Sequence, residues 1–280
     1  MTSRSFPVYH VDAFTARPFG GNPAGVVLDA GGMTDAQMQL VARELKHSET
    51  AFVLPSKDAD YRIRFFTPAR EVDLCGHATV ATAWVLASEG RLKRGRARQE
   101  TNLGVLDLDV DRDRVMMEQL PPKTEAVELR RDDLADLLGI EAIDPVLPVQ
   151  KASTGNWVLV VPMAGEKEIN LCQPGFPELA ALNLELGVIG THLFTLGKDG
   201  SIYARHFAPA CGINEDPVTG TANGALGGYL VLNDLAKGPE FRVRQGDALG
   251  RPGELTVHAT DKEVRVGGRA VILSRGSITF

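Results

Sequence analysis

The sequence predicts a mixed α/β protein made of two similar domains that face each other across a pseudo-twofold cleft. The main observation is an internal repeat. In each copy an Arg, a Phe and Pro-Ala precede a short acidic loop and a Gly-x-Ala step that opens an apolar segment. The first copy contains Arg64 and the step Gly76-His77-Ala78, and the second contains Arg205 and the step Gly220-Thr221-Ala222.

The flanking segments correspond as well. AFVLPSKDADYRIRFF lies over LFTLGKDGSIYARHF almost without a gap, and each reads as two β-strands around a polar Lys-Asp turn. This alignment places Thr191 opposite Glu49. Further along, LDLDVDRDRVMME and LTVHATDKEVRV again read as two strands around a charged turn. Three correspondences in the same order indicate a duplicated domain, and a site between the two halves is expected.

Composition narrows the classes of function. A chain of 280 residues with 44% hydrophobic and 24% charged residues is typical of a globular protein with two domains. The net charge of −6 argues against a nucleic-acid partner. The start lacks the apolar core of a signal peptide, and the longest apolar run, WVLVVPMA, is too short to span a bilayer. Three cysteines without C-x-x-C spacing suit free thiols, so we expect a cytoplasmic protein without a membrane partner.

Local signals predict three helices that matter for the site. Thr34 is a good N-cap for MTDAQMQLVARELK, in which Met38, Val41, Ala42 and Leu45 recur at helical spacing. A second helix is predicted after Gly76, with Gly90 as its stop signal. The third, after Gly220, is rich in glycines that suit close packing.

The two Gly-x-Ala steps are candidate anion sites. A helix that begins directly after a strand presents backbone N–H groups and the positive end of its dipole, so Gly76 and Gly220 are candidates for holding a carboxylate. His77 begins the first helix and Asp216 precedes the second. Each also has a plainer interpretation, since a His can cap a helix and Asp-Pro can open an ordinary turn.

Two further residues are candidates for the site. Glu49 lies between the end of a predicted helix and a predicted buried strand, where a carboxylate can act as a general acid/base. The alternative is a surface glutamate at a helix end. Asn22 lies in the Gly/Pro-rich stretch TARPFGGNPAG, which is either a ligand-binding loop or a plain hairpin connection.

Several familiar motifs are missing from the sequence. It contains no phosphate-binding G-x-x-x-x-G-K-[ST], no G-x-S-x-G and no H-E-x-x-H or H-x-H. The second helix also fails the dinucleotide pattern, because Ala222 stands where glycine is required. These observations predict chemistry without a cofactor or a metal.

The motifs together resemble one known family. VDAFTARPFGGNPAGVV, HSETAFV, FFTPAREVDLCGHATVATA, MEQLPP and FAPACGINEDPVTGTANGAL look like the phenazine-biosynthesis PhzF-like isomerases, which have the diaminopimelate epimerase-like fold. The resemblance implies two domains, each with a curved sheet around a central helix, and an active-site cleft between them. We expect the first domain over residues 1–121, with the strand 274–280 returning to it, and the second over residues 125–273.

The resemblance also implies roles for particular residues. Glu49 matches the family's general acid/base, Gly76 and His77 match its Gly-His pair, and the family's E-D-x-x-T-G stretch matches Glu215 to Gly220, followed by the hydroxyl of Thr221. These matches imply an isomerase that shifts a proton in a small carboxylated amino or hydroxy acid, with Glu49, His77 and Asp216 as catalytic residues. A homodimer is the usual expectation.

Two alternatives stay open. Diaminopimelate epimerases and proline racemases carry one cysteine at each helix start, whereas this chain has Cys75 at the first and Thr219 at the second. Racemisation by two thiols is therefore not available, but a proline-racemase-like dehydratase or epimerase could use Cys75 as its base. A catalytically silent protein that binds a small ligand is the alternative from another class.

Overall fold

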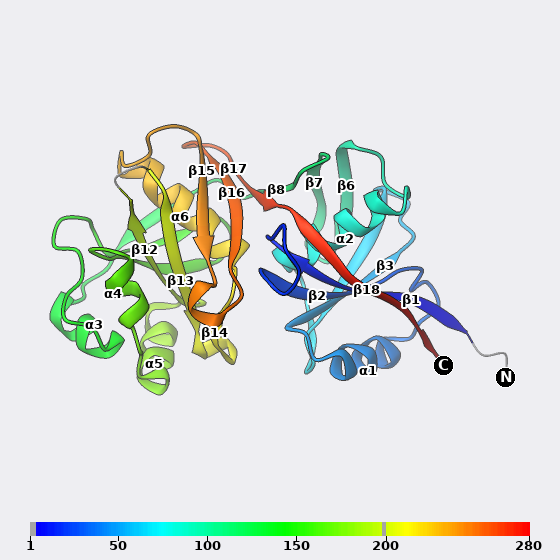
Figure 1. The fold of residues 1–280 in the computed structure, drawn as a ribbon, viewed down its shortest axis with the longest axis horizontal. Coiled ribbons are helices and arrows are strands. Elements are labelled where there is room, and N and C mark those ends of the chain that lie inside the picture. Colours follow the sequence, from blue (N-terminus) through cyan, green and yellow to red (C-terminus); the bar gives the residue numbers. More distant parts are fainter. Residues whose placement is uncertain (1–3, 198–199) are drawn as a thin grey trace. The chain divides into compact units, whose positions relative to one another are not determined.

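A computed structural model describes residues 4–197 and 200–280, which form two compact units (Figure 1). Unit 1 comprises Met1–Glu118 and Gly267–Phe280, and unit 2 comprises Gln119–Val266. Lys198 and Asp199, the turn predicted for the second copy, lie outside the described residues. Among the described residues, no helix has the length and apolar character needed to cross a membrane.

Unit 1 begins with β1 (Ser5–Ala13), which pairs antiparallel with both β18 (Ala270–Thr279) and β2 (Asn22–Val27). β2 runs parallel to β3 (Glu49–Leu54), and β3 forms a hairpin with β4 (Tyr61–Phe66). β4 pairs with the short β5 (Glu71–Val72) and runs parallel to β6 (Gly95–Thr101). β7 (Gly104–Val110) and β8 (Val115–Gln119) then follow as antiparallel neighbours.

Two helices complete unit 1. α1 (Asp35–Leu45) starts at the predicted N-cap, where the Thr34 hydroxyl accepts from the Gln37 N–H and the Gln37 side chain accepts from the Thr34 N–H. α2 (Gly76–Ser88) is the predicted apolar helix, and it packs against β1, β2, β3, β7 and β18 (Figure 1). Because α2 is buried around most of its circumference, its first turn is held firmly by the strands about it.

Unit 2 contains β9 (Lys123–Ala126), β10 (Gln150–Ser153), β11 (Trp157–Pro162), β12 (Thr191–Leu196), β13 (Ile202–Ala208), β14 (Ile213–Asp216), β15 (Glu240–Gln245), β16 (Gly253–Ala259) and β17 (Val264–Gly268). Its helices are α3 (Arg131–Leu138), α4 (Glu166–Leu171), α5 (Phe176–Leu186) and α6 (Gly220–Leu232), with 3₁₀ turns at Pro209–Cys211 and Asp247–Leu249. α6 packs against β9, β10, β11 and β16 (Figure 1).

The two units repeat one pattern of strand pairing, which confirms the predicted duplication. A parallel pair (β2–β3, β11–β12) leads into a hairpin (β3–β4, β12–β13), then a short antiparallel strand (β5, β14) and the central helix (α2, α6). The next strand returns parallel to the hairpin (β4–β6, β13–β15). The predicted fold class, an α/β duplication with a sheet around a central helix in each half, is therefore correct.

The strand register corrects one detail of the sequence alignment. Thr50 is the partner of Phe66 in unit 1, and Thr191 is the partner of Phe207 in unit 2. Since Phe66 and Phe207 are equivalent in the repeat, Thr191 corresponds to Thr50, and Gly190 corresponds to Glu49. The expectation that Thr191 stands opposite Glu49 is wrong by one residue. It assumed a one-residue gap within the hairpin, whereas Thr50 to Phe66 and Thr191 to Phe207 span the same length.

In both units the repeated arginine pairs with a glutamate in the same geometry. Arg64 donates through Nε and Nη2 to both carboxylate oxygens of Glu71, at 2.7 Å each, and Arg205 donates in the same way to Glu215, at 2.8 Å each. Each guanidinium also lies over a phenylalanine ring. The segment between Arg205 and Glu215 is three residues longer, and it contains the 3₁₀ turn Pro209–Cys211.

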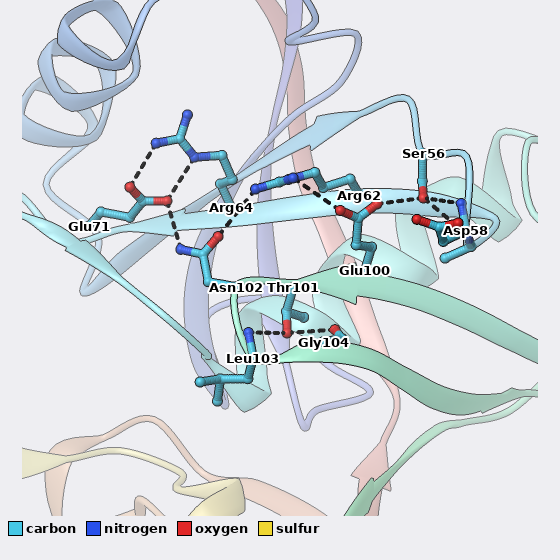
Figure 2. A network of polar contacts seen from close by, with 11 residues as sticks. Ser56, Asp58, Arg62, Arg64, Glu71, Glu100, Thr101, Asn102, Leu103 and Gly104 are labelled. Atoms are coloured by element: carbon cyan, nitrogen blue, oxygen red, sulfur yellow. Dashed lines mark hydrogen bonds and ion pairs between the residues drawn. The ribbon is translucent and has the colours of Figure 1, made fainter.

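Figure 2 shows how a polar network extends the Arg64–Glu71 pair in unit 1. Asn102 donates its amide to Glu71 at 3.1 Å, and Arg62 donates to both Asn102 and Glu100. Glu71 belongs to β5, and α2 begins five residues after it, at Gly76. The network therefore anchors the segment that leads to the start of α2.

Candidate active site

Three candidate residues of unit 1 meet at the start of α2. α1 ends at Leu45, Lys46 takes the left-handed conformation (φ 56°), and the chain turns into β3 at Glu49. From the other direction, β5 leads to Cys75, the N-cap residue of α2, and His77 lies in the first turn of that helix. Two segments far apart in sequence thus present a carboxylate, a thiol and an imidazole to one another.

The imidazole of His77 lies at the centre of this group. Its Nε2 is 3.4 Å from Glu49 Oε2 and 3.3 Å from Ser48 Oγ. Cys75 Sγ is 3.4 Å from His77 Nδ1 and 3.8 Å from Nε2. The His77 and Glu49 side chains are only 10% and 16% exposed, so the pair is largely shielded from water. Such a group can pass a proton to and from a bound molecule.

The chain before Glu49 is held by a pair of histidines. His10 of β1 and His47 form a hydrogen bond between Nδ1 and Nε2 at 2.7 Å, and their rings meet edge to face. One ring must donate and the other accept. This bond ties the turn that carries Ser48 and Glu49 to the sheet of unit 1.

The same group is also the candidate for a metal site. Glu49, Cys75 and His77 each offer a ligand atom within 4.8 Å of the others. The sulfur is nearly equidistant from both ring nitrogens, so it lies beside the ring and not along the lone pair of either nitrogen. A metal on His77 would lie along such a lone pair, and Cys75 would have to rotate to reach it. The present arrangement suits proton transfer better than coordination.

In unit 2, the acidic loop before α6 holds two of the candidate residues. Asp216 ends β14, and Thr219 is the N-cap residue of α6. The Thr219 hydroxyl donates a hydrogen bond to Asp216 Oδ2. It therefore does not cap the helix, and Cys75 likewise makes no side-chain cap at α2. At both helix starts, the N-cap side chain leaves the first-turn amides to other partners.

A series of buried, hydrogen-bonded side chains contacts this loop. Gln245, the last residue of β15, bonds to the Asp216–Thr219 segment and to Asn223 of α6. Asn223 in turn lies 3.3 Å from His192 Nε2. Burial in the interior lowers the pKa of His192 to about 4, so its ring is neutral near pH 7. Neutral His192 donates to the Asn223 carbonyl oxygen.

The remaining candidates occupy the expected helix starts or lie close by. Gly76 and Gly220 are the first residues of α2 and α6, and Thr221 is the second residue of α6. Asn22 is not part of an open loop, because it is the first residue of β2 and is 1% exposed. It lies two residues before Ala24, the strand partner of Glu49, at the same end of the sheet.

Sequence reasoning missed Gln245 and Asn223, although each leaves a signal. Phe241, Val243 and Gln245 alternate along β15, and Val243 and Gln245 are fully buried. An amide at such an inward position needs a partner. Asn223 is the one amide side chain in the Ala/Gly-rich segment of α6, and it is also fully buried.

Known proteins match the chain over almost its whole length. A sequence model of the family described as Phenazine biosynthesis-like protein matches residues 11–276. An uncharacterized isomerase from Clostridium acetobutylicum is 38% identical, over 99% of both chains. A Bacillus anthracis phenazine biosynthesis protein of the PhzF family superposes with a TM-score of 0.91 at 35% identity, over 98% of this chain and 99% of that one.

More distant structures share only the fold. A hydroxyproline epimerase from Agrobacterium vitis superposes with a TM-score of 0.67 at 13% identity, over 99% of this chain and 93% of that one. Epimerases of this kind therefore have the same duplicated architecture. Their likeness to this chain is much weaker than that of the PhzF protein.

Proposed function

Because this chain belongs to the phenazine biosynthesis-like protein family, whose sequence relatives are named isomerases, we propose that it is an isomerase that shifts a proton within a small carboxylated metabolite. An unsaturated amino or hydroxy acid is the expected substrate class, and the proposed reaction needs no cofactor. The observation that carries the proposal is the close approach of Glu49 Oε2 to His77 Nε2, at 3.4 Å beside the first turn of α2.

In the proposed reaction Glu49 is the base. Its carboxylate takes a proton from an allylic carbon, the C–H electron pair becomes part of a delocalised anion, and the substrate carboxylate shares the negative charge. Backbone amides at the start of α2 would stabilise that charge. The proton on Glu49 exchanges with solvent, and the carboxyl group then protonates the far carbon of the allyl system, which moves the double bond and leaves the overall composition unchanged.

The other candidates are assigned to orientation. His77 contacts Glu49 directly, so it can hold the carboxylate in one position and bond to a polar substituent of the substrate. Asp216, with Thr221 and the start of α6, is assigned to a second polar group of the substrate. A thiol mechanism through Cys75 is supported less well, since Thr219 is the corresponding N-cap residue in unit 2 and supplies no second thiol.

A hydrogen-exchange assay over a panel of acids tests the proposal and identifies the substrate class at the same time. The protein is incubated in D₂O with a set of unsaturated amino and hydroxy acids, including cyclic dienoic acids, and deuterium uptake is read by mass spectrometry. We expect uptake into one chemical class, and a loss of about 10²-fold or more in Glu49→Gln, since general acid/base catalysis contributes that much.

Glu100→Gln is the matched control for this assay. Glu100 is also a half-buried glutamate of unit 1, with a side chain 22% exposed, but it pairs with Arg62 and Ser56. Its variant should exchange at the wild-type rate. If Glu49→Gln exchanged as fast as Glu100→Gln, Glu49 would not be the base.

A further inference from the structure

We propose that Gln245 is a positioning residue, which acts on the reaction by orienting Thr219 and, through it, Asp216. The inference rests on the proposed function, because it takes Asp216 to contact the substrate. Gln245 is fully buried at the end of β15, whereas Asp216 and Thr219 are half-buried. It therefore contacts the loop from the protein interior.

Both the oxygen and the nitrogen of the Gln245 carboxamide bond to this loop, and the oxygen also bonds to α6. Its Oε1 accepts from the Thr219 N–H at 3.2 Å and from the Asn223 amide at 2.7 Å. Its Nε2 donates to the Asp216 carbonyl oxygen at 3.0 Å and to Thr219 Oγ1 at 3.2 Å. Reversal of the amide would bring donors against donors, so its orientation is determined. One side chain thus binds the backbone at both Asp216 and Thr219.

This orientation determines what the Thr219 hydroxyl can do. Since the hydroxyl oxygen accepts from Gln245, the hydroxyl proton is directed to Asp216 Oδ2. Gln245 therefore sets Thr219 as the donor to Asp216 Oδ2, and this bond holds the Asp216 side chain in one rotamer.

The side chain of Asn223 supports the same arrangement. Its Nδ2 donates both to Gln245 Oε1 and to the Thr219 carbonyl oxygen, at 2.7 and 2.9 Å. Its Oδ1 is then left to accept from His192. The hydrogen bonds that connect His192, Asn223, Gln245 and Thr219 therefore have one consistent assignment of donors and acceptors, which strengthens each bond.

Unit 1 lacks this arrangement, so it is not a requirement of the repeated fold. Tyr61 pairs with Gln99 in unit 1, and the equivalent Ile202 pairs with Val243 in unit 2. Gln99 is therefore equivalent to Val243. Two residues further along each strand, Thr101 occupies the place of Gln245. Thr101 Oγ1 donates to Gly104 within its own turn. The Gln245 contacts occur in the unit whose loop carries the candidate site residue Asp216.

The experiment compares Gln245→Met with Gln99→Met. Methionine has a similar size but cannot make these hydrogen bonds. Gln99 is the matched control, because it is also a fully buried strand glutamine and its amide bonds to Tyr61 and to Thr79 of α2. Two readouts are used: amide hydrogen exchange at Thr219, and the kcat and KM of deuterium uptake by the acid found in the assay above.

We expect Gln245→Met to speed amide exchange at Thr219 by about tenfold, since one backbone bond is lost. Its kcat should fall by up to about 10²-fold with a KM within about threefold of wild type, because a small misplacement of a reacting group costs that much. Gln99→Met should change neither. A double-mutant cycle then combines Gln245→Met with Thr219→Val. If Gln245 acts through Thr219, the double variant is no slower than Thr219→Val alone.

The outcomes separate this inference from the proposed function. Additive losses in the double variant, or an unchanged kcat in Gln245→Met, would overturn it, as would wild-type protection of the Thr219 amide in that variant. Absence of deuterium uptake by wild-type protein with every acid would instead defeat the proposed function. In that case amide exchange still decides whether Gln245 holds the loop.

Discussion

Glu49 and His77 approach to 3.4 Å in unit 1, from the first residue of β3 and the first turn of α2. Cys75 contacts the same imidazole, with Sγ 3.4 Å from Nδ1 and 3.8 Å from Nε2. One histidine therefore contacts two possible bases, a carboxylate and a thiol. The proposed function assigns the chemistry to the carboxylate, and the two bases can be separated by experiment.

Cys75→Ala is expected to lower the deuterium-exchange rate by well under the ~10²-fold that loss of a general base costs. The reason is that the thiol lies beside the ring, while Glu49 remains in place. Cys172→Ala is the control, since Cys172 is also a buried thiol but bonds to a backbone carbonyl in unit 2. If Cys75→Ala abolished exchange while Glu49→Gln retained it, the base would be the thiol and the racemase-like reaction would replace the proposed one.

The two arginine–glutamate pairs should differ in their effect on stability. Arg205 and Glu215 have side chains 8% and 11% exposed, and Arg205 also donates to two backbone carbonyls. Arg205→Met should therefore lower the free energy of unfolding by about 3–5 kcal/mol, because it leaves a buried charge without its partner. Arg64→Met should cost about 1 kcal/mol, since Glu71 is 28% exposed and keeps Asn102. Equal losses in urea unfolding would contradict this explanation.

His192 should make the protein less stable at mildly acidic pH. Its pKa is lowered to about 4 by burial, whereas the unfolded chain has the ordinary value of 6.5. Between these values the unfolded state binds the proton and the folded state does not, so the free energy of unfolding falls as the pH falls from 6.5 toward 4. The contribution is roughly 3 kcal/mol.

His192→Gln tests this pH dependence, because glutamine can still donate to Asn223 but does not titrate. Urea unfolding at intervals from pH 7 to pH 4.5 should show a flatter curve for the variant. Buried His206 also has a lowered pKa, so part of the dependence should remain. Curves of identical slope for the two proteins would contradict this explanation, because His192 would then bind its proton in the folded state as readily as in the unfolded chain.

Gly224→Ala should destabilise α6 even though alanine is the better helix former. A Cβ at Gly224 would overlap the Gln119 side chain, which accepts from the Thr154 hydroxyl at 2.6 Å and donates to the Gly220 carbonyl at 3.3 Å. We expect a loss of about 1–3 kcal/mol in urea unfolding. Gly76→Ala is the comparison, because a Cβ there would have only Met117 Cε nearby, at 3.5 Å. A Gly224→Ala protein as stable as wild type would mean that Gln119 can move freely.

Features that depend on neighbouring residues could be predicted from the sequence. The start of α1 followed from Thr34, and the starts of α2 and α6 followed from Gly76 and Gly220, because caps and helix starts are local signals. The duplication was also visible, since each copy carries its arginine, its acidic loop and its glycine in the same order.

Features that depend on strand register and on contacts between distant segments came only from the tertiary structure. The alignment of Thr191 was off by one residue, because hydrogen-bond register, and not residue similarity, determines strand equivalence. The sequence marked Glu49, Cys75 and His77 singly, but only folding brings a helix start beside a strand start. Gln245 shows the same limit, because its strand meets the Asp216–Thr219 loop only after β15 has paired with β13.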